Sequence, residues 1–339
     1  IIYSVGMAME LFLSVIVVAG GAATFVYGLK LLGDGTEKLV GGRLKKFVSA
    51  CVGKPFGGFL AGTAAAGLTQ SSAAVTMIAV GLAECGAITF FQSAPVVMGA
   101  NVGTTVTAQF IAIFGRGGDY RAAVGAAAVA AGAILGFFKT ETPKNAGDAL
   151  VGFGLMVSGL AALSEKIVAL KEIPIAVGFS AAENPFLLFL TGAVAAAVTQ
   201  SSSAVTGILI TFSDNSFSAF YKAIFVILGS NSGSCAAVIF SSADKSLPAR
   251  EAAVFNLVFN LLGGIVFFPV VMACKGVLPY IFPHSLSDAG RAMADFHTVF
   301  NLAASALAFP FLRPLTRLTE KIVSEKSKKT KNGVKNACN

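Results

Sequence analysis

One tetrapeptide occurs twice in this chain, and the repetition constrains the fold more than any other feature of the sequence. Thr-Gln-Ser-Ser at residues 69–72 reappears at residues 199–202, 130 positions later. Around the two motifs, segments 55–76 and 185–206 align without a gap and are identical at 14 of 22 positions. A duplication of this length predicts two halves that share one fold.

The composition indicates that the chain folds in lipid. Hydrophobic residues make up 55% of the sequence, charged residues only 12%, and the mean hydropathy is +0.78. An average globular chain carries about 25% charged residues. Because a chain this apolar does not stay dissolved alone, a water-soluble protein is excluded. We expect an all-α multi-pass membrane protein.

Each copy of the motif interrupts an apolar segment that would otherwise be one helix. Segments 55–83 and 185–212 break near Thr-Gln-Ser-Ser, and we interpret each as two half-helices in a re-entrant hairpin or discontinuous span. Segments 88–114 and 217–240 are interrupted by Gly-x-Asn-x-Gly motifs that the same offset relates. Such breaks occur at membrane depth only where protein buries them or a water-filled cavity adjoins them.

The duplication divides the chain into four parts. We expect a first inverted repeat over residues 1–145, a second over 146–275, an additional C-terminal transmembrane region over 276–315 and a basic cytoplasmic tail over 316–339. The charges of equivalent loops support the inversion. The polar connector over residues 33–54 holds five basic and two acidic residues, whereas its counterpart over 164–184 holds two basic and three acidic residues. Opposite bias is what inverted halves would show under the positive-inside rule.

Most of the net charge of +8 lies in the C-terminal segment, where eight basic residues follow Leu312 against two acidic ones. In a membrane protein such a segment predicts a cytoplasmic end and not a nucleic-acid arm. We expect a multi-pass protein of the plasma membrane, with a cytoplasmic C-terminus whose final residues are unstructured. The oligomeric state, including a homo-oligomer, stays open.

Metal and disulfide chemistry find no support in the sequence. The five cysteines are scattered without metal-ligand spacing or a disulfide framework, and the two histidines, His284 and His297, have no nearby partner for a zinc site. No cofactor is expected beyond a coupling ion.

A Gln-Ser-Ser sequence at a helix break can bind ions without fixed charge. Its hydroxyls, its amide and the free N–H groups of the next helix form an oxyanion site, which the helix dipole reinforces. The same oxygens, with exposed carbonyls, suit a hard cation such as Na⁺. Apart from Glu84, Asp214 and Asp295, the apolar segments hold almost no acids. A multiply charged anion would therefore need co-bound cations, although Glu84 and Asp214 also fit a loop-tip or interfacial role.

The ordered motifs resemble the type II sodium–phosphate cotransporter family, in a short bacterial form. The resemblance rests on segments 69–73, 199–204 and 99–105, and on Phe296-His297 with Phe300-Asn301, and it covers the chain from about Met9 to Leu312. It implies Na⁺-driven uptake of inorganic phosphate, inverted repeats and a site where the two Gln-Ser-Ser hairpins meet.

The resemblance also implies the site residues. Phosphate or Na⁺ would contact the residues of the two motifs, namely Gln70, Ser71, Ser72, Gln200, Ser201, Ser202 and Ser203. The same site would be lined by Asn101, Thr104, Thr105, Asn231 and Ser234. Na⁺ itself is expected on Gln70, Ser71, Thr199, Gln200 and Ser202.

Three departures from the family pattern concern the number of Na⁺ ions and electrogenicity more than the substrate class. Ala73 replaces the usual third serine of the first motif, and residues 232–235 read Ser-Gly-Ser-Cys instead of a threonine-rich run. The first repeat also lacks the Phe-Asn pair found at residues 259–260.

Other functions use some of the same residues. An intramembrane serine hydrolase could pair Ser234 with His297, but duplicated serine clusters have no use in such a dyad. A channel would use a similar oxygen-rich lining. A transporter of the same fold could carry another oxyanion, such as sulfate or arsenate. For His297 and Asn301, one turn apart on one helix face, a structural helix-packing role is the competing interpretation.

Overall fold

The computed structural model describes residues 2–114, 120–170, 183–213 and 215–337, and these residues form helices and their connections without a strand. The helices are, in chain order, α1 (Ile2–Cys51), α2 (Pro55–Thr69), α3 (Ser72–Glu84), α4 (Phe90–Gly103), α5 (Thr105–Phe114), α6 (Tyr120–Gly136), α7 (Glu141–Leu170), α9 (Pro185–Thr199), α10 (Ser202–Phe212), α11 (Phe217–Gly233), α12 (Cys235–Ser241), α13 (Leu247–Ala273), α14 (Leu278–Ile281), η1 (Pro283–Leu286), α15 (Ala289–Ala308), η2 (Phe309–Phe311) and α16 (Leu312–Ala337).

The predicted broken segments are confirmed in both halves. Helices α2 and α3 form a hairpin around Gln70 and Ser71, and α9 and α10 form its equivalent around Gln200 and Ser201. The second interruption is shorter than the Gly-x-Asn-x-Gly motif suggested, because the helix resumes after one residue, Thr104 between α4 and α5. Ser234 separates α11 from α12 in the same way.

Glycines let each hairpin approach the helix that follows it closely. Helix α2 packs on α4, and α9 packs on α11. A Cβ atom at Gly62 would overlap the carbonyl oxygen of Val96, and one at Gly99 would overlap that of Phe59. The second half repeats both contacts at the same offset, at Gly192 with Val226 and at Gly229 with Phe189. The duplication therefore extends to backbone packing, in the manner of small-residue interfaces between membrane helices.

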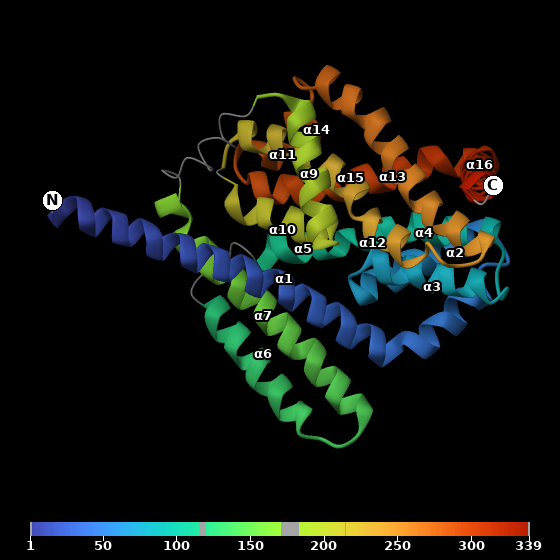
Figure 1. Cartoon of the computed structure of the whole chain (residues 1–339). Helices are drawn as coiled ribbons and strands as arrows, with labels where there is room; N and C mark the ends of the chain where they lie inside the picture. Colours follow the sequence, from blue (N-terminus) through green and yellow to red (C-terminus); the bar gives the residue numbers. More distant parts are fainter. Residues whose placement is uncertain (1, 115–119, 171–182, 214, 338–339) are drawn as a thin grey trace.

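Helices α1 and α7 lie along each other, and α6 folds back on α7 as an outer hairpin (Figure 1). The prediction of a polar connector over residues 33–54 was wrong, because α1 continues as a helix to Cys51. Leu44, Val48 and Val52 are buried at a spacing of four residues and give the segment an apolar stripe. Its charged residues occupy the remaining faces and do not end the helix.

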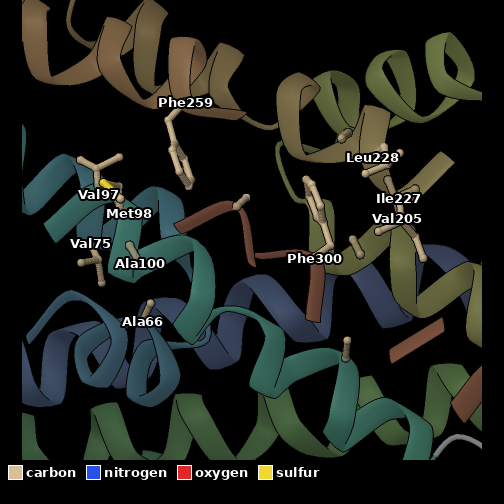
Figure 2. Packing of buried hydrophobic residues seen from close by; sticks show 14 of the residues in the cluster. Ala66, Val75, Val97, Met98, Ala100, Val205, Ile227, Leu228, Phe259 and Phe300 are labelled. Atoms are coloured by element: carbon tan, nitrogen blue, oxygen red, sulfur yellow. The ribbon is translucent and has the colours of Figure 1, made fainter. Parts of the chain in front are cut away.

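Helices α13 and α15 join the two halves. Helix α13 packs against α3 and α4 of the first half and against α11 and α12 of the second, while α15 packs against α4, α5, α10 and α11. Figure 2 shows Phe259 of α13 and Phe300 of α15 near buried residues of both halves, including Met98 and Ile227. Phe255 stacks on Phe259, and Phe296 stacks on Phe300. The core is thus continuous across the repeat boundary.

The C-terminal segment is helical where the structure describes it, so the expectation of an unstructured end was wrong for residues up to Ala337. Helix α16 packs on α13 and α4. It buries Leu312, Thr316, Thr319 and Val323, whose spacing of three or four residues places them on one face. Figure 1 places the chain end beside the α2–α4 side of the molecule.

Six of the described helical segments are long and apolar enough to cross a membrane. They are Phe12–Cys51, Phe90–Phe114, Glu141–Ser164, Phe217–Ser241, Leu247–Ala273 and Ala289–Ser324. Large apolar side chains on these helices, such as Phe12 and Ile265, are more than half exposed. An all-α multi-pass membrane protein is therefore confirmed.

The close contacts of the glycines predict a large cost for adding one methyl group. Gly99→Ala should destabilise the protein by about 1–3 kcal/mol, because the new Cβ would overlap a backbone oxygen that cannot move independently. Gly81→Ala is the matched control, since nothing lies within 4 Å of a Cβ at that position in α3. Thermal unfolding of the detergent-purified protein measures the difference. Equal melting temperatures for the two variants would contradict the packing described.

A polar contact outside the membrane-spanning helices also joins α3 to α13. Glu84 accepts hydrogen bonds from the hydroxyl of Ser246 at 2.6 Å and from its backbone N–H at 2.7 Å. These two bonds lower the pKa of Glu84 below its ordinary value of 4.5. The carboxylate lies at the start of α13, where the helix dipole favours negative charge. This geometry agrees with the loop-tip role considered for Glu84, whereas Asp214 lies outside the described residues.

The lowered pKa of Glu84 predicts a pH-dependent contribution to stability. The contribution is present above the carboxyl's unfolded pKa and is lost as the pH falls through the lower folded pKa. Glu84→Gln should therefore lower the melting temperature at pH 7, and the difference from wild type should shrink as the solution is acidified below pH 4.5. Asp34→Asn, an exposed site on α1, serves as the control. A difference that is independent of pH would show that ionised Glu84 does not make the contact.

Candidate functional site

The tips of the two hairpins have an unusual backbone conformation. Gln70 (φ 53°, ψ 26°) and Gln200 (φ 56°, ψ 23°) are left-handed, and they are the non-glycine residues with positive φ in the part of the chain described. The left-handed region costs a residue with a Cβ roughly 1–2 kcal/mol, and glycine would remove that cost. Strain of this kind concentrates at functional sites. Its presence at the same point of both repeats indicates that the glutamine side chains serve a purpose.

The residues around each glutamine shape the turn identically in the two halves. The hydroxyl of Thr69 donates to the carbonyl of Ala65 at 2.9 Å, and that of Thr199 donates to Ala195 at 2.8 Å. Ser71 is the N-cap of α3, where its hydroxyl accepts the N–H of Ala74 at 3.1 Å. Ser201 caps α10 through Ala204, also at 3.1 Å.

The turn leaves a helix N-terminus at the tip of each hairpin. The first N–H groups of α3, those of Ser72 and Ala73, have no acceptor within their own helix, and the same holds for Ser202 and Ser203 of α10. Ser202 and Ser203 are buried, at 5% and 3% exposure. The carboxamide oxygen of Gln70 is buried without a hydrogen-bond partner. Each hairpin therefore offers N–H groups, a hydroxyl and an amide from one turn of chain.

The structure brings the hairpin of one half to the helix break of the other. The hydroxyls of Thr104, between α4 and α5, and Ser203, in the first turn of α10, lie 3.1 Å apart and are buried. In the opposite pairing, Ala73 takes the place of Ser203, and the hydroxyl of Ser234 donates to the carbonyl of Asn231 at 2.9 Å. Of the predicted site residues, Thr104 of the first repeat and Ser203 of the second therefore lie in contact. Thr105 instead donates to the carbonyl of Val102, at 2.7 Å.

The asparagines of the Gly-x-Asn-x-Gly motifs are each held by a helix outside their own hairpin. Asn101 donates to the amide oxygen of Asn256 on α13 at 3.2 Å, and Asn260 donates to the same oxygen at 3.0 Å. Asn231 donates to the amide oxygen of Asn301 on α15 at 2.9 Å. All of these side chains are nearly inaccessible to solvent. Two similar asparagine clusters therefore fix the two broken helices.

The second cluster also contains His297. Its Nε2 lies 3.3 Å from Oδ1 of Asn231, and Asn301 donates to the backbone carbonyl of His297 at 2.8 Å. Because the amide nitrogen of Asn231 donates to Asn301, its oxygen accepts, and Nε2 of His297 carries the hydrogen. The hydroxyl of Ser234 is bonded to a backbone carbonyl, so the Ser234–His297 dyad considered from the sequence does not form.

Two functional candidates were missed by the sequence analysis, Asn256 and Asn260. The signal that could have found them is a similarity between α13 and α15, since residues 255–260 read Phe-Asn-Leu-Val-Phe-Asn and residues 296–301 read Phe-His-Thr-Val-Phe-Asn. The absence of a Phe-Asn pair within the first repeat was interpreted as a departure. The structure shows that α13 supplies this function to Asn101 from the other half.

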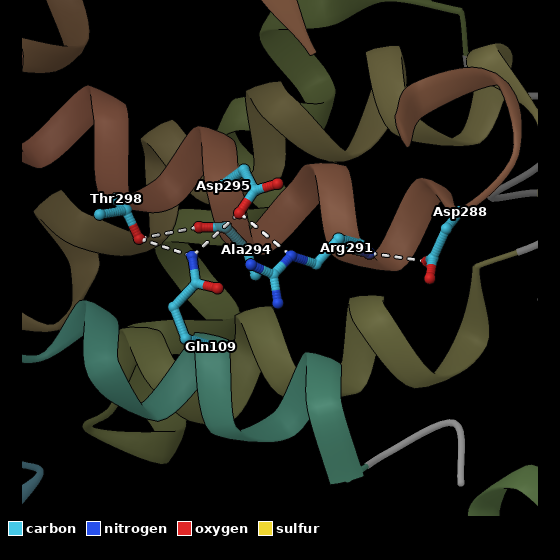
Figure 3. Close-up of polar contacts among 6 residues, drawn as sticks. All are labelled: Gln109, Asp288, Arg291, Ala294, Asp295 and Thr298. Atoms are coloured by element: carbon cyan, nitrogen blue, oxygen red, sulfur yellow. Dashed lines mark hydrogen bonds and ion pairs between the residues drawn. The ribbon is translucent and has the colours of Figure 1, made fainter. Parts of the chain in front are cut away.

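A further polar group lies where α5 meets α15 (Figure 3). Gln109 donates to the carboxylate of Asp295 at 3.2 Å and to the hydroxyl of Thr298 at 3.0 Å. Arg291, one turn before Asp295 on α15, forms an ion pair with it at 3.3 Å. The charge of Asp295 is therefore balanced by Arg291, which lies on the same helix.

Fixed charge is scarce around the hairpins. Within the described residues, no group of three or more histidine, cysteine, aspartate or glutamate side chains could hold a metal ion. The donors at the two breaks are neutral hydroxyls, amides and backbone groups. Such a set binds a small anion at helix N-termini and a hard monovalent cation through oxygen atoms.

Comparison with known proteins identifies the family. The profile of the Na⁺/Pi-cotransporter family matches residues 24–165 and 177–301. The chain belongs to the Na⁺/Pi-cotransporter family. The first matched segment runs past the first repeat to residue 165, and the second runs past the second repeat to residue 301. A family of transporters sets the hydrolase aside, so the protein is not an enzyme.

Curated relatives match at low identity. The chain is 26% identical over 306 residues to "Uncharacterized protein YqeW" of Bacillus subtilis, covering 89% of this chain and 96% of the relative. It is 26% identical over 311 residues to "Putative inorganic phosphate export protein YjbB" of Escherichia coli K12, covering 89% of this chain and 54% of that protein. The chain therefore spans about half the length of the YjbB proteins it matches. No solved structure matches the chain.

The left-handed glutamines predict a separation of stability from function. Gln70→Gly should be at least as stable as Gln70→Ala, since glycine adopts the left-handed conformation without the cost of about 1–2 kcal/mol. Both variants should lose transport, because both lack the amide. Thermal unfolding and a transport assay on the same preparations test this. A glycine variant that is less stable than the alanine variant would show that Gln70 is not left-handed in solution.

Proposed function

We propose that the protein is a secondary active transporter that carries inorganic phosphate together with Na⁺ across the plasma membrane by alternating access. The observation that carries the proposal is the matched pair of hairpin tips, each with a left-handed glutamine directly before a helix N-terminus that a serine caps. A structural turn would use glycine at this position. Membership of the Na⁺/Pi-cotransporter family supports the substrate.

The anion would bind between the two helix N-termini. The N–H groups at the starts of α3 and α10 and the hydroxyls of Ser72 and Ser202 can donate to phosphate oxygens. Gln70 and Gln200 would close the site through their amide nitrogens. The pairing of Thr104 with Ser203 supports a common site, because it joins the second hairpin to the first half.

Coupling follows from the lack of fixed positive charge at the hairpins. A phosphate ion carried through the low-dielectric interior needs compensation, and bound cations supply it reversibly. The proposed Na⁺ ligands are the oxygens of Gln70, Ser71, Thr199, Gln200 and Ser202. In this scheme Na⁺ binds first, orders the broken helices and completes the anion site.

Alternating access would use the two halves as opposed elements. We propose that the repeats are inverted in the membrane, which the opposite charge bias of their connectors supports. The basic α16 segment would then lie on the cytoplasmic side. Helices α13 and α15, which contact both halves, would couple the movement of one half to the other.

The direction of transport depends on the gradients and not on the site. Each YjbB relative carries the words "phosphate export" in its name, whereas symport driven by the usual inward Na⁺ gradient gives uptake. A coupled carrier runs either way, so the physiological direction of this chain is a separate question from coupling. A carrier of another small oxyanion, such as sulfate or arsenate, is the second candidate, because helix N-termini recognise any compact oxyanion.

The decisive assay is uptake of radiolabelled phosphate into proteoliposomes under an inward Na⁺ gradient, with K⁺ and choline as replacements. We expect uptake that requires Na⁺ and that falls at least about 100-fold in Ser72→Ala and Ser202→Ala, which corresponds to roughly 2.7 kcal/mol of lost binding. Ser93→Ala is the matched control, since Ser93 is a buried serine whose hydroxyl bonds to Phe90 within its own helix.

The outcomes separate the parts of the proposal. Uptake of phosphate that is equal in K⁺ and Na⁺ would contradict the coupling while leaving the substrate. Sulfate or arsenate uptake without phosphate uptake would favour the second candidate. Undiminished phosphate affinity without Na⁺ would contradict the order of binding.

A further inference from the structure

Two buried threonines beside the proposed anion site leave their hydroxyls without a partner. Thr107 on α5 and Thr206 on α10 are both 0% exposed, and neither hydroxyl makes a hydrogen bond. Threonines in helices usually donate to the carbonyl four residues earlier. In this protein that bond is made by Thr36, Thr63, Thr69, Thr191, Thr199, Thr211, Thr298 and Thr319. Thr107 and Thr206 depart from this pattern, although a buried hydroxyl without a hydrogen-bond partner is unfavourable.

The two hydroxyls belong to one interface. Helices α5 and α10 pack together, and the hydroxyls of Thr104 and Ser203 are 3.1 Å apart at its beginning. Further along, a Cβ atom at Gly207 would lie 2.7 Å from Cδ1 of Ile111. Thr107 is one turn after Thr104, and Thr206 is one turn after Ser203, so both lie between these two contacts. Four hydroxyls therefore gather there, and we name Thr104, Thr107, Ser203 and Thr206 the hydroxyl cluster.

Backbone groups add to this interface. Helix α10 begins at Ser202 with a partial positive charge, and at the α4–α5 junction the backbone N–H of Thr107 donates to the carbonyl of Thr104. The hydroxyl of Thr107 does not donate to the carbonyl of Gly103, the last residue of α4. It therefore leaves the lone pairs of that carbonyl to a ligand. A cation at the α4 end and an anion at the α10 end would both be favoured, and each would offset the other's charge.

The equivalent interface in the other half lacks most of these oxygens. Helix α3 packs against α12, where Ala73 corresponds to Ser203 and Ala237 corresponds to Thr107. Only Thr76 and Ser234 remain, and Ser234 already donates to a backbone carbonyl. The two halves are therefore matched at the hairpin tips but unequal one turn deeper.

We infer that the hydroxyl cluster between α5 and α10 is a binding site for one hard monovalent cation, Na⁺, and that the α3–α12 interface is not. Neutral hydroxyl and carbonyl oxygens are the ligands that such a cation takes at broken membrane helices. The inference rests on the proposed function, which it deepens by placing a coupling ion on Thr107 and Thr206. Thr206 lies one turn beyond Ser202, one of the oxygens proposed above for Na⁺.

Direct Na⁺ binding tests the inference apart from transport. The full chain, purified in detergent, is titrated with radioactive ²²Na⁺, and its melting temperature is compared in NaCl and choline chloride. Thr107→Val and Thr206→Val preserve shape and remove the hydroxyl. Each should weaken Na⁺ binding about tenfold or more and reduce the stabilisation by NaCl. Thr107→Ser and Thr206→Ser, which keep the hydroxyl, should retain binding and show that the sites tolerate substitution.

Two matched controls use threonines that the inference leaves out. Thr211→Val removes a hydroxyl on α10 that is bonded to Gly207, and Thr76→Val removes the unpaired hydroxyl of the equivalent position in the first half. Both should bind Na⁺ like wild type. Wild-type affinity in Thr107→Val and Thr206→Val, or an equal loss of affinity in Thr76→Val, would overturn the inference.

The test also separates this inference from the proposed function. If the protein takes up phosphate but Thr107→Val and Thr206→Val bind Na⁺ like wild type, only the cation site at the hydroxyl cluster is refuted. Na⁺ binding that depends on Thr107 and Thr206, in a protein that takes up no phosphate, would support the cluster and refute the substrate.

Discussion

The structure depends on breaking helices inside a membrane protein without leaving the backbone unsatisfied. At each hairpin tip a glutamine in the left-handed conformation reverses the chain, and the following serine caps the new helix. Hydroxyls of Thr69 and Thr199 bond to the ends of the preceding helices. The first N–H groups of α3 and α10 have no acceptor within their own helices, and they are groups that a ligand can use.

The remainder of the molecule holds these breaks in place. Glycines bring α2 against α4 and α9 against α11 at backbone contact, which fixes each hairpin relative to a broken helix. Asparagines on α13 and α15 bind the asparagines at the second pair of breaks. Stacked phenylalanines along α13 and α15 then place apolar side chains beside these polar clusters. Rigidity at the polar breaks therefore comes from apolar packing around them.

Features that depend on local sequence were predictable, and those that depend on distant contacts were not. The duplicated motifs gave the hairpins and the breaks near Asn101 and Asn231, because glycine and Gln-Ser-Ser act within a few residues. The continuation of α1 to Cys51 and the helical α16 were missed because both segments are rich in charged residues. Their buried faces consist of single residues spaced three or four apart, which are hard to recognise among the charges. The partner of Asn101 on α13, Asn256, was missed because it lies 155 residues away, on a helix assigned to the other half. The unpaired state of Thr206 is invisible in sequence, where it looks like any helical threonine.

Helix α13 belongs to the second repeat but packs against the first, and this arrangement bears on how such a protein can arise. Asn101 belongs to the first repeat, yet its partner Asn256, and Asn260 that donates to the same amide oxygen, belong to the second. A single repeat would offer this amide the carbonyl of Val97 in its own helix, at 2.9 Å, but not the second acceptor on α13. The molecule is therefore interlocked in the way of a domain-swapped dimer whose two chains have been fused. Substitutions in α13 consequently act on the opposite half of the molecule, and the two halves can diverge only together.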